Sequence, residues 1–453
     1  MKNSKRGWGL WLGLAVLIRL ILMPITLHGD LIYTNYFPYF FSYERVWDIY
    51  GYFGDHFLKL SGYTYYAPMI YFISGIFQFL LRITHLAPGF QVFMFRVHET
   101  MIVAAPHQIS DYFVGLSRAE AFRLIFIMKL PYLVIEAACL WLLCGICRLW
   151  DRAEAERAFR GWLFHPVLLF SVYCFGTYRI YTVFFVLLVI YFAVRSQNVL
   201  AGVAYGLLLL TDNFPWILLL PTVLILGSTW RERIKILACI LASFSAIFVP
   251  LWIHSGGYVS YVYASPVLAK AAAQGLTHSF AVKEIALITK VFFVAAYAWM
   301  LWMLARPRQA GVELQGKRAQ LFVAVCAWIL LIFYAASQTL VQYFMWVFPF
   351  WMLLETREKL WSRWVGAAFF LCLFFFNLDS RALNAGLFMP LHWDWAGVPS
   401  VHERLASRMP YGKMVAAARW LFSGMCLYFA YRIYRERIAP RLAVLSGGGG
   451  GGS

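Results

Sequence analysis

The sequence predicts an all-α polytopic membrane protein with about 12–14 transmembrane helices and interfacial helices in large outer loops. The first reason is composition: 62% of the 453 residues are apolar and only 13% are charged. Soluble domains are about 45–50% apolar and about 25% charged. The second reason is that apolar runs of membrane-spanning length recur from Trp8 to Tyr431.

The basic residues are placed as in a membrane protein. The net charge is +18, but the Lys and Arg residues form short clusters between apolar runs, as the positive-inside rule expects at cytoplasmic ends. This placement argues against nucleic acid as a partner. Assigning every cluster to the cytoplasm puts both ends of the chain on that side, so we expect an even number of spans.

The expected spans follow one another along the whole chain. Segment 199–227 contains TDNFP at its middle and predicts two short helices that turn on the outer side. Segment 90–106 is interrupted by Arg96, His98 and Glu99, and counting it brings the total to an even number of about fourteen. The other expected spans are 8–27, 66–83, 124–147, 162–176, 179–195, 235–254, 286–305, 319–336, 339–355, 364–378 and 413–432.

This topology predicts three sizeable outer loops, at 28–65, at about 255–285 and at 379–412. We expect one membrane domain over residues 1–445 and no separate soluble domain. The last residues, 446–453, read SGGGGGGS and resemble a flexible linker of the kind left by a fusion or tag.

The first outer loop carries the candidate catalytic residues Asp30, Glu44 and Asp48. Asp30 lies at the end of the first expected membrane helix. A carboxylate held close to the hydrocarbon boundary costs free energy, so its presence there indicates a function. The simpler alternative for Asp30 is pairing with an Arg or capping the next helix. For Glu44 and Asp48, the simpler alternative is the solvated face of an interfacial helix. These carboxylates could hold a divalent metal, but their spacing follows no known ligand pattern, so we assign no cofactor.

The third outer loop combines basic and aromatic residues at membrane level. Arg forks suit phosphate oxygens, and Trp faces suit sugar rings. The alternative is an interfacial aromatic belt with snorkelling basic residues. The candidate substrate-binding residues of this loop are Arg381, His392, Arg404 and Arg408, among Trp393 and Trp395.

Four stretches, in order, resemble the GT-C superfamily of membrane glycosyltransferases, and together they cover most of residues 8–355. The outward Asp30 and YTYYAPMIYFISGIF resemble that superfamily's acidic first loop and its Y-x-P-P-type motif. IMKLPYLVIEAACLWLL resembles its K-L-P segment. The run from FHPVLLF to DNFPWILLLP resembles its N-P…G-Q-x-D…T-K…P segment, and QTLVQYFMWVFPFWMLL its late Y…P-F helix.

The resemblance implies a reaction. GT-C enzymes of the mannosyltransferase-like kind take a sugar from a polyprenyl-phosphate donor and pass it to a lipid, glycan or protein acceptor at the outer leaflet. It implies Asp30 as the catalytic base, membrane lipids as surroundings and a site at the outer face of the membrane. Because the sequence shows no long eukaryotic-style loops and no retention signal, we expect a bacterial inner membrane, with the site facing the periplasm. The further substrate-binding candidates are His28, Tyr65, Tyr66, Arg179 and Tyr343.

Three positions depart from the superfamily pattern. Gly176-Thr177-Tyr178-Arg179 replaces G-Q-x-D, Thr211-Asp212 replaces T-K, and Glu136 replaces an Asp. Arg179 stands where the superfamily has an Asp, and Asp212 stands where it has a Lys. The two charges are thus exchanged, which indicates a charge swap. We therefore expect Arg179 and Asp212 to pair across the outer surface.

Other functions stay open at this point. A flippase or transporter of lipid-linked glycans would use charges within its spans, and Glu136, some seven residues beyond Lys129, is the chief one. A catalytically silent partner protein and a glycan polymerase or ligase are further alternatives. Neither the sugar nor the acceptor follows from the sequence.

Overall fold

The computed structural model describes residues 2–56, 66–103, 109–150, 152–256, 258–260, 262, 280–306, 315–337, 341–355, 380–406 and 408–445. Every regular element in these ranges is a helix, as predicted. The elements are α1 Lys2–Ile25, α2 Gly29–Ser42, α3 Ile49–His56, α4 Pro68–Thr84, α5 Pro88–Val103, η1 Ile109–Phe113, α6 Arg118–Trp150, α7 Arg152–Leu163, α8 Pro166–Leu168, η2 Leu169–Cys174, α9 Arg179–Val194, α10 Asn198–Leu209, α11 Pro215–Leu226, α12 Trp230–His254, η3 Tyr258–Ser260, α14 Phe280–Ala305, α15 Gln315–Ala336, η5 Val341–Trp346, α16 Phe348–Glu355, η6 Arg381–Leu383, η7 Ala385–Phe388, η8 Trp393–Gly397, α18 Val401–Leu405, α19 Tyr411–Ile433, η9 Tyr434–Ile438 and α20 Ala439–Leu445.

Four segments of the described chain are long and apolar enough to cross a membrane: Arg118–Trp150, Trp230–His254, Gly316–Ala336 and Tyr411–Val444. The bent pair α1–α2 would be a fifth, and five further apolar helices are shorter, with 10–17 residues. The described residues are thus all-helical and compatible with a polytopic membrane protein. The count of about 12–14 spans stays a prediction.

Several predicted spans are interrupted helices. The run 162–176 breaks at His165-Pro166 into the short α8 and a π-helical turn, η2. The run 339–355 contains the 3-10 turn η5 before the eight-residue α16. The segment 90–106 corresponds to the 16-residue α5, and the segment 364–378 lies outside the described residues.

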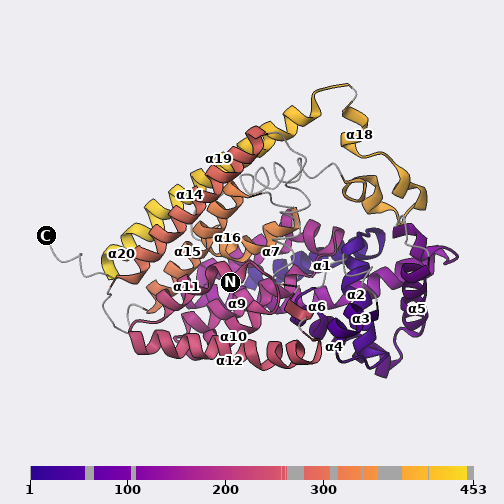
Figure 1. The fold of residues 1–453 in the computed structure, drawn as a ribbon, viewed down its shortest axis with the longest axis horizontal. Helices are drawn as coiled ribbons and strands as arrows, with labels where there is room; N and C mark the ends of the chain where they lie inside the picture. Colours follow the sequence, from indigo (N-terminus) through magenta and orange to yellow (C-terminus); the bar gives the residue numbers. More distant parts are fainter. Residues whose placement is uncertain are drawn as a thin grey trace.

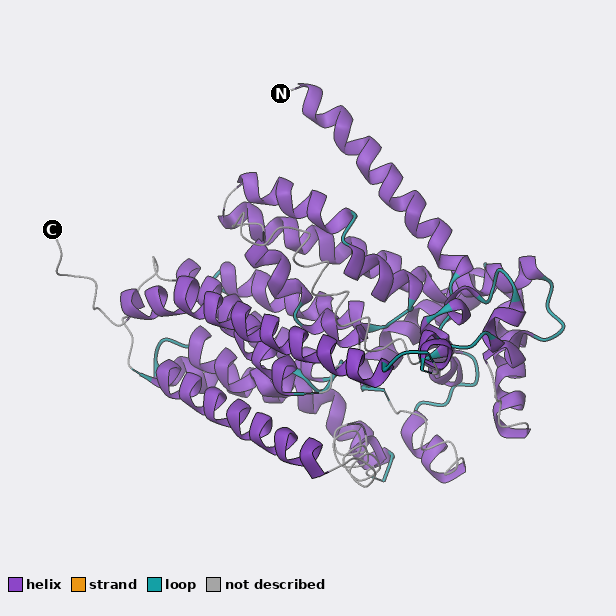
Figure 2. Cartoon of the chain, turned by 90° about the horizontal axis from the view of Figure 1, so that it is seen from above, coloured by secondary structure: helices purple, strands orange, loops and turns teal. Residues whose placement is uncertain are grey.

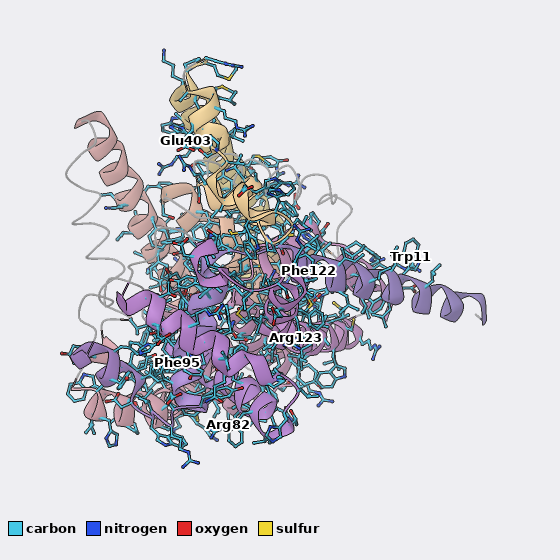
Figure 3. All side chains as sticks on the ribbon, turned by 90° about the vertical axis from the view of Figure 1, so that its right-hand side faces the viewer. Trp11, Arg82, Phe95, Phe122, Arg123 and Glu403 are labelled. Carbon is cyan, nitrogen blue, oxygen red and sulfur yellow. The ribbon has the colours of Figure 1, made fainter. Side chains whose placement is uncertain are left out.

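The helices pack in layers around α9. Helix α9 packs against α6, α10 and α15, and eleven of its sixteen residues are buried. On one side α10 lies along α12, and on the other α15 packs against both α14 and α19 (Figure 1). The N-terminal half of α1 projects away from this body (Figure 2). The apolar side chains of its residues 10–14, including Trp11 (Figure 3), are exposed in the isolated chain, as expected of a helix that faces lipid.

The first predicted outer loop, 28–65, begins with a buried helix. Eleven of the fourteen residues of α2 are buried, because its aromatic side chains pack on rings of α3, α4 and α5, among them Phe53, Tyr71 and His98. The chain turns by 83° between α1 and α2. The interfacial helix expected over Glu44–Tyr52 starts only at Ile49, because Asp48 accepts the Gly51 N–H at 2.9 Å and caps α3 there.

The contact between α10 and α12 requires glycine. A Cβ at Gly206 would lie 2.4 Å from the Ile240 carbonyl oxygen and 1.9 Å from Ser243 Oγ. Gly206→Ala is therefore expected to destabilise the protein by about 1–3 kcal/mol, because α12 has to move outward. The unfolding midpoint in detergent measures this.

Gly424→Ala is the matched control. Gly424 lies on α19, where an added Cβ would meet nothing within 4 Å, so this substitution is expected to be neutral or slightly stabilising. Equal midpoints for Gly206→Ala and the wild type would show that α10 and α12 do not pack through this glycine.

Candidate functional site

Asp30 lies in the first turn of α2, at the corner where the chain leaves α1. His28 caps this turn: its Nδ1 accepts the Asp30 N–H at 3.2 Å and lies 3.7 Å from Asp30 Oδ1. The His28 ring stacks on Phe175, with 3.8 Å between centroids. A carboxylate is favoured at a helix N-terminus, and 26% of the Asp30 side chain stays exposed. Asp30 is therefore both fixed and accessible.

A glycine turn brings α9 against this corner. Gly176 has a φ of +75°, a conformation that favours glycine. A Cβ there would lie 3.3 Å from the Cβ of Leu31 on α2 and 3.5 Å from Cε of Lys129. The close approach sets the start of α9, with Arg179 as its first residue, beside the start of α2.

The predicted pair of Arg179 and Asp212 is confirmed, but it is buried rather than on the outer surface. Arg179 Nε lies 3.5 Å from Asp212 Oδ2, and both side chains are less than a tenth exposed. That oxygen accepts its hydrogen bond from Trp346 Nε1 at 2.9 Å, so the arginine contact is a charge pair and not a hydrogen bond. The burial follows from the aromatic side chains of η5, which cover both groups.

Aromatic rings surround the Arg179 guanidinium. Its Cζ lies 4.3 Å from the ring centroid of Tyr343 and 5.0 Å from that of Tyr178, within cation–π range. The Tyr66 ring packs on Tyr178 at 4.9 Å. Asp30 is close enough to act electrostatically on both Tyr178 and Arg179. The structure thus brings four predicted site residues into one neighbourhood, with His28 at its edge, whereas Tyr65 lies outside the described residues.

Glu44 and Asp48 do not join this neighbourhood. Helix α2 separates Asp30 from Glu44 by roughly 20 Å, because 14 residues rise about 1.5 Å each. Glu44 is exposed and accepts the Tyr39 hydroxyl at 2.7 Å, and Asp48 caps α3. Both residues lie beyond the C-terminal end of α2, away from Asp30.

The third outer loop contacts the Asp30 corner through its backbone. The Leu27 N–H donates to the Leu387 carbonyl at 2.8 Å. Arg381 forms an exposed pair with Glu403 at 2.7 Å, and His392 Nδ1 lies 3.4 Å from Asp394. Hydrogen bonds from Arg381 and from the Ser400 N–H lower the pKa of Glu403 to about 2, so this carboxylate is ionised near neutral pH. Arg404 and Arg408 are exposed.

Lys129 is a buried residue to which the sequence analysis gave no role. Its Nζ donates to the Thr26 carbonyl at 2.6 Å, to Thr26 Oγ1 at 2.8 Å and to the Tyr173 carbonyl at 2.6 Å. It thus joins the end of α1 to η2, the segments that lead to Asp30 and Arg179. The sequence signal that could have identified Lys129 is a lone Lys inside an apolar run.

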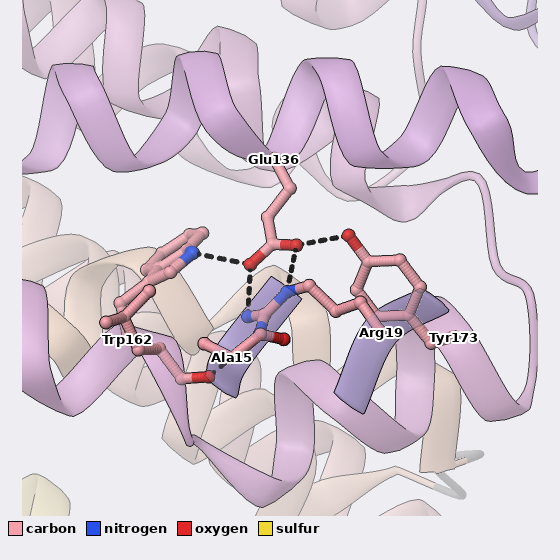
Figure 4. Close-up of polar contacts among 6 residues, drawn as sticks. Ala15, Arg19, Glu136, Trp162 and Tyr173 are labelled. Carbon is pink, nitrogen blue, oxygen red and sulfur yellow. Dashed lines mark hydrogen bonds and ion pairs between the residues drawn. The ribbon is translucent and has the colours of Figure 1, made fainter. Parts of the chain in front are cut away.

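Glu136, the chief mid-span charge, is held in a satisfied network (Figure 4). Its two oxygens accept from Arg19 Nε at 2.8 Å, Arg19 Nη2 at 2.6 Å, Trp162 Nε1 at 2.9 Å and the Tyr173 hydroxyl. Arg19 also donates to the carbonyls of Ala15 and Leu163, both at 2.9 Å. This is the arrangement of a structural ion pair.

Among the described residues, no group of three or more His, Cys, Asp or Glu side chains could hold a metal ion. Comparisons with known protein families, with characterised proteins and with solved structures find no match for this chain.

Proposed function

We propose that the chain is a GT-C-type membrane glycosyltransferase. In this proposal it moves a sugar from a polyprenyl-phosphate donor to a lipid or glycan acceptor at the periplasmic face of a bacterial inner membrane. The observation that carries the proposal is Asp30: an accessible carboxylate in contact with His28, in the first turn of α2 and beside the turn that begins α9.

In the proposed reaction, Asp30 accepts the proton of an acceptor hydroxyl as general base. The acceptor oxygen forms a bond to the anomeric carbon of the sugar while the bond from that carbon to the phosphate oxygen breaks. The electron pair leaves with the phosphate, which departs as polyprenyl phosphate. A developing charge of this kind needs a nearby cation. Arg179 and the exposed Arg404 and Arg408 are the candidates for that role.

The surroundings support lipid-linked substrates. Tyr66, Tyr178 and Tyr343 offer aromatic faces beside Arg179, and aromatic side chains suit a ligand with both apolar and polar parts. Helix α6 is long and apolar enough to span a membrane, and α1 is so together with the bent α2. In this proposal a donor with its prenyl chain in the bilayer presents its phosphate near the corner between α1 and α2.

Asp30→Asn is expected to lower sugar transfer by about 10²-fold or more, the low end of what acid–base catalysis contributes. The assay uses purified protein, a panel of radiolabelled polyprenyl-phosphate sugars and a membrane lipid extract as acceptor. Asparagine keeps the size and the N-terminal position of Asp30, so the fold is expected to persist.

Asp48→Asn is the matched control, because it changes the same side chain at the cap of α3, away from Asp30. It is expected to keep wild-type transfer. A wild-type rate in Asp30→Asn would remove Asp30 from the reaction, and a loss confined to Asp48→Asn would move the base to α3.

A further inference from the structure

A cavity of about 480 Å³ lies between η1 and η8 rather than at Arg179. Its volume falls within the range of about 300–1,000 Å³ that is usual for small-molecule sites. The residues that line it and that bear on its chemistry are Ser110, Phe113, Gly115, Trp393, Asp394 and Gly397. We call this cavity the η1–η8 groove.

One wall of the groove is an oriented indole. The Trp393 ring stacks on Phe113 at 5.0 Å with 22° between the planes, which fixes its direction. The Asp394 carboxylate beside it is 89% exposed, with His392 Nδ1 at 3.4 Å. A fixed aromatic face next to free carboxylate acceptors suits a ligand with an apolar face and several hydroxyl donors.

The charge of the lining argues against an anionic ligand. Its residues include the Asp394 carboxylate and contain no Lys or Arg, whereas phosphate is bound by Arg and Lys. The donor phosphate therefore fits the Arg179 side of the corner better than this groove. A neutral polyhydroxylated group fits the groove.

The backbone of the groove is open at two glycines. A Cβ at Gly115, whose φ is +80°, or at Gly397 would meet nothing within 4 Å. Backbone polar groups there can be approached without steric hindrance, which adds hydrogen-bonding partners of fixed direction for a sugar.

Both walls contact the corner that carries Asp30. On the η1 side, Ile109 Cδ1 lies 3.3 Å from where a Cβ of Gly29 would be. On the other side, the segment leading to η8 accepts the Leu27 N–H through Leu387 at 2.8 Å. The elements that form the groove are thus joined to the segments on either side of His28, next to the candidate base.

We infer that the η1–η8 groove binds the neutral sugar part of the acceptor, an inference that rests on the proposed function. The acceptor would then be a glycan or glycolipid whose neutral sugar lies between Trp393 and Asp394, with a hydroxyl directed toward the Asp30 corner. This assigns acceptor selection to the third outer loop and donor binding to the Arg179 side.

Calorimetric titration of the full chain in nanodiscs with mannobiose, lactose, chitobiose and maltotriose tests the inference, with inorganic phosphate as the charged comparison. At least one saccharide is expected to bind, and Trp393→Ala to weaken it about 10-fold or more. Asp394→Asn is expected to weaken it as well. Trp395→Ala, two residues on and outside the lining, is the control and is expected to bind as the wild type does.

Trp393→Phe is the control for a folding defect in Trp393→Ala. It keeps a ring against Phe113, so it is expected to fold and to retain part of the affinity for the saccharide. The inference is overturned by a lack of binding of all four saccharides, by equal affinity in Trp393→Ala and the wild type, or by phosphate binding in their place. Saccharide binding that depends on Trp393, in a protein that transfers no sugar, would support the groove and overturn the proposed function.

Discussion

Glu136→Ala is expected to lower the free energy of unfolding by about 3–5 kcal/mol, the usual cost of removing one partner of a buried ion pair. Arg19 is 3% exposed, and without Glu136 its guanidinium would stay buried with carbonyl acceptors but no counter-charge. Trp162 Nε1 and the Tyr173 hydroxyl would lose their acceptor at the same time. Unfolding in mixed micelles followed by tryptophan fluorescence measures the effect.

The double variant Arg19→Met/Glu136→Met is the informative control. Replacing both charges with apolar groups of similar volume removes the unpaired charge, so much of the lost stability is expected to return. Sugar transfer should return with it. A stable double variant that has lost function would instead give Glu136 a role in moving substrate, as a transporter would require.

Asp212→Ala is expected to cost about 3–5 kcal/mol for the same reason, since Arg179 would lose the carboxylate that lies 3.5 Å from its Nε. Trp346 Nε1 and the Asn213 N–H, which donate to Asp212 at 2.9 and 2.8 Å, would also lose their acceptor. Arg179→Ala leaves Asp212 buried without its cation and is expected to be comparably unstable.

The rate of sugar transfer by these variants distinguishes a structural role of Arg179 and Asp212 from a role in substrate binding. We expect the loss of transfer in Asp212→Ala to follow the loss of folded protein, whereas Arg179→Ala, which also removes a candidate cation for the leaving phosphate, is expected to lose transfer beyond the loss of folded protein. Assays at a temperature where the folded fraction is matched to the wild type separate the two effects. A fully stable but inactive Asp212→Ala would place Asp212 in the substrate site as well.

Local signals in the sequence predicted much of the helix pattern. The turn between α10 and α11 was expected at TDNFP and is found there, because Asp212, Asn213 and Pro215 interrupt an otherwise apolar run. The burial of α2 was not predicted. Its tyrosines and Pro38 are typical of an outer loop, and only packing against α3, α4 and α5 makes the segment a buried helix.

The candidate site was predictable where charges were compared in pairs. The exchange of charge between Arg179 and Asp212 predicted their contact, but their burial depends on Tyr343 and Trp346, which are more than 130 residues from Asp212. The Arg19–Glu136 pair was missed, although each is a charge within an apolar run. Two such charges of opposite sign are expected to find each other, but the sequence alone does not place α1 beside α6.

The chemical form of the sugar label after incubation tests the central claim most directly. Wild-type protein in proteoliposomes receives a radiolabelled polyprenyl-phosphate sugar and a lipid-extract acceptor, and the lipids are then separated. The proposal predicts label on a new acceptor product, with one polyprenyl phosphate released for each sugar transferred. Label that stays on the intact donor, whether it crosses the bilayer or not, would contradict glycosyl transfer and favour a flippase or a catalytically silent protein.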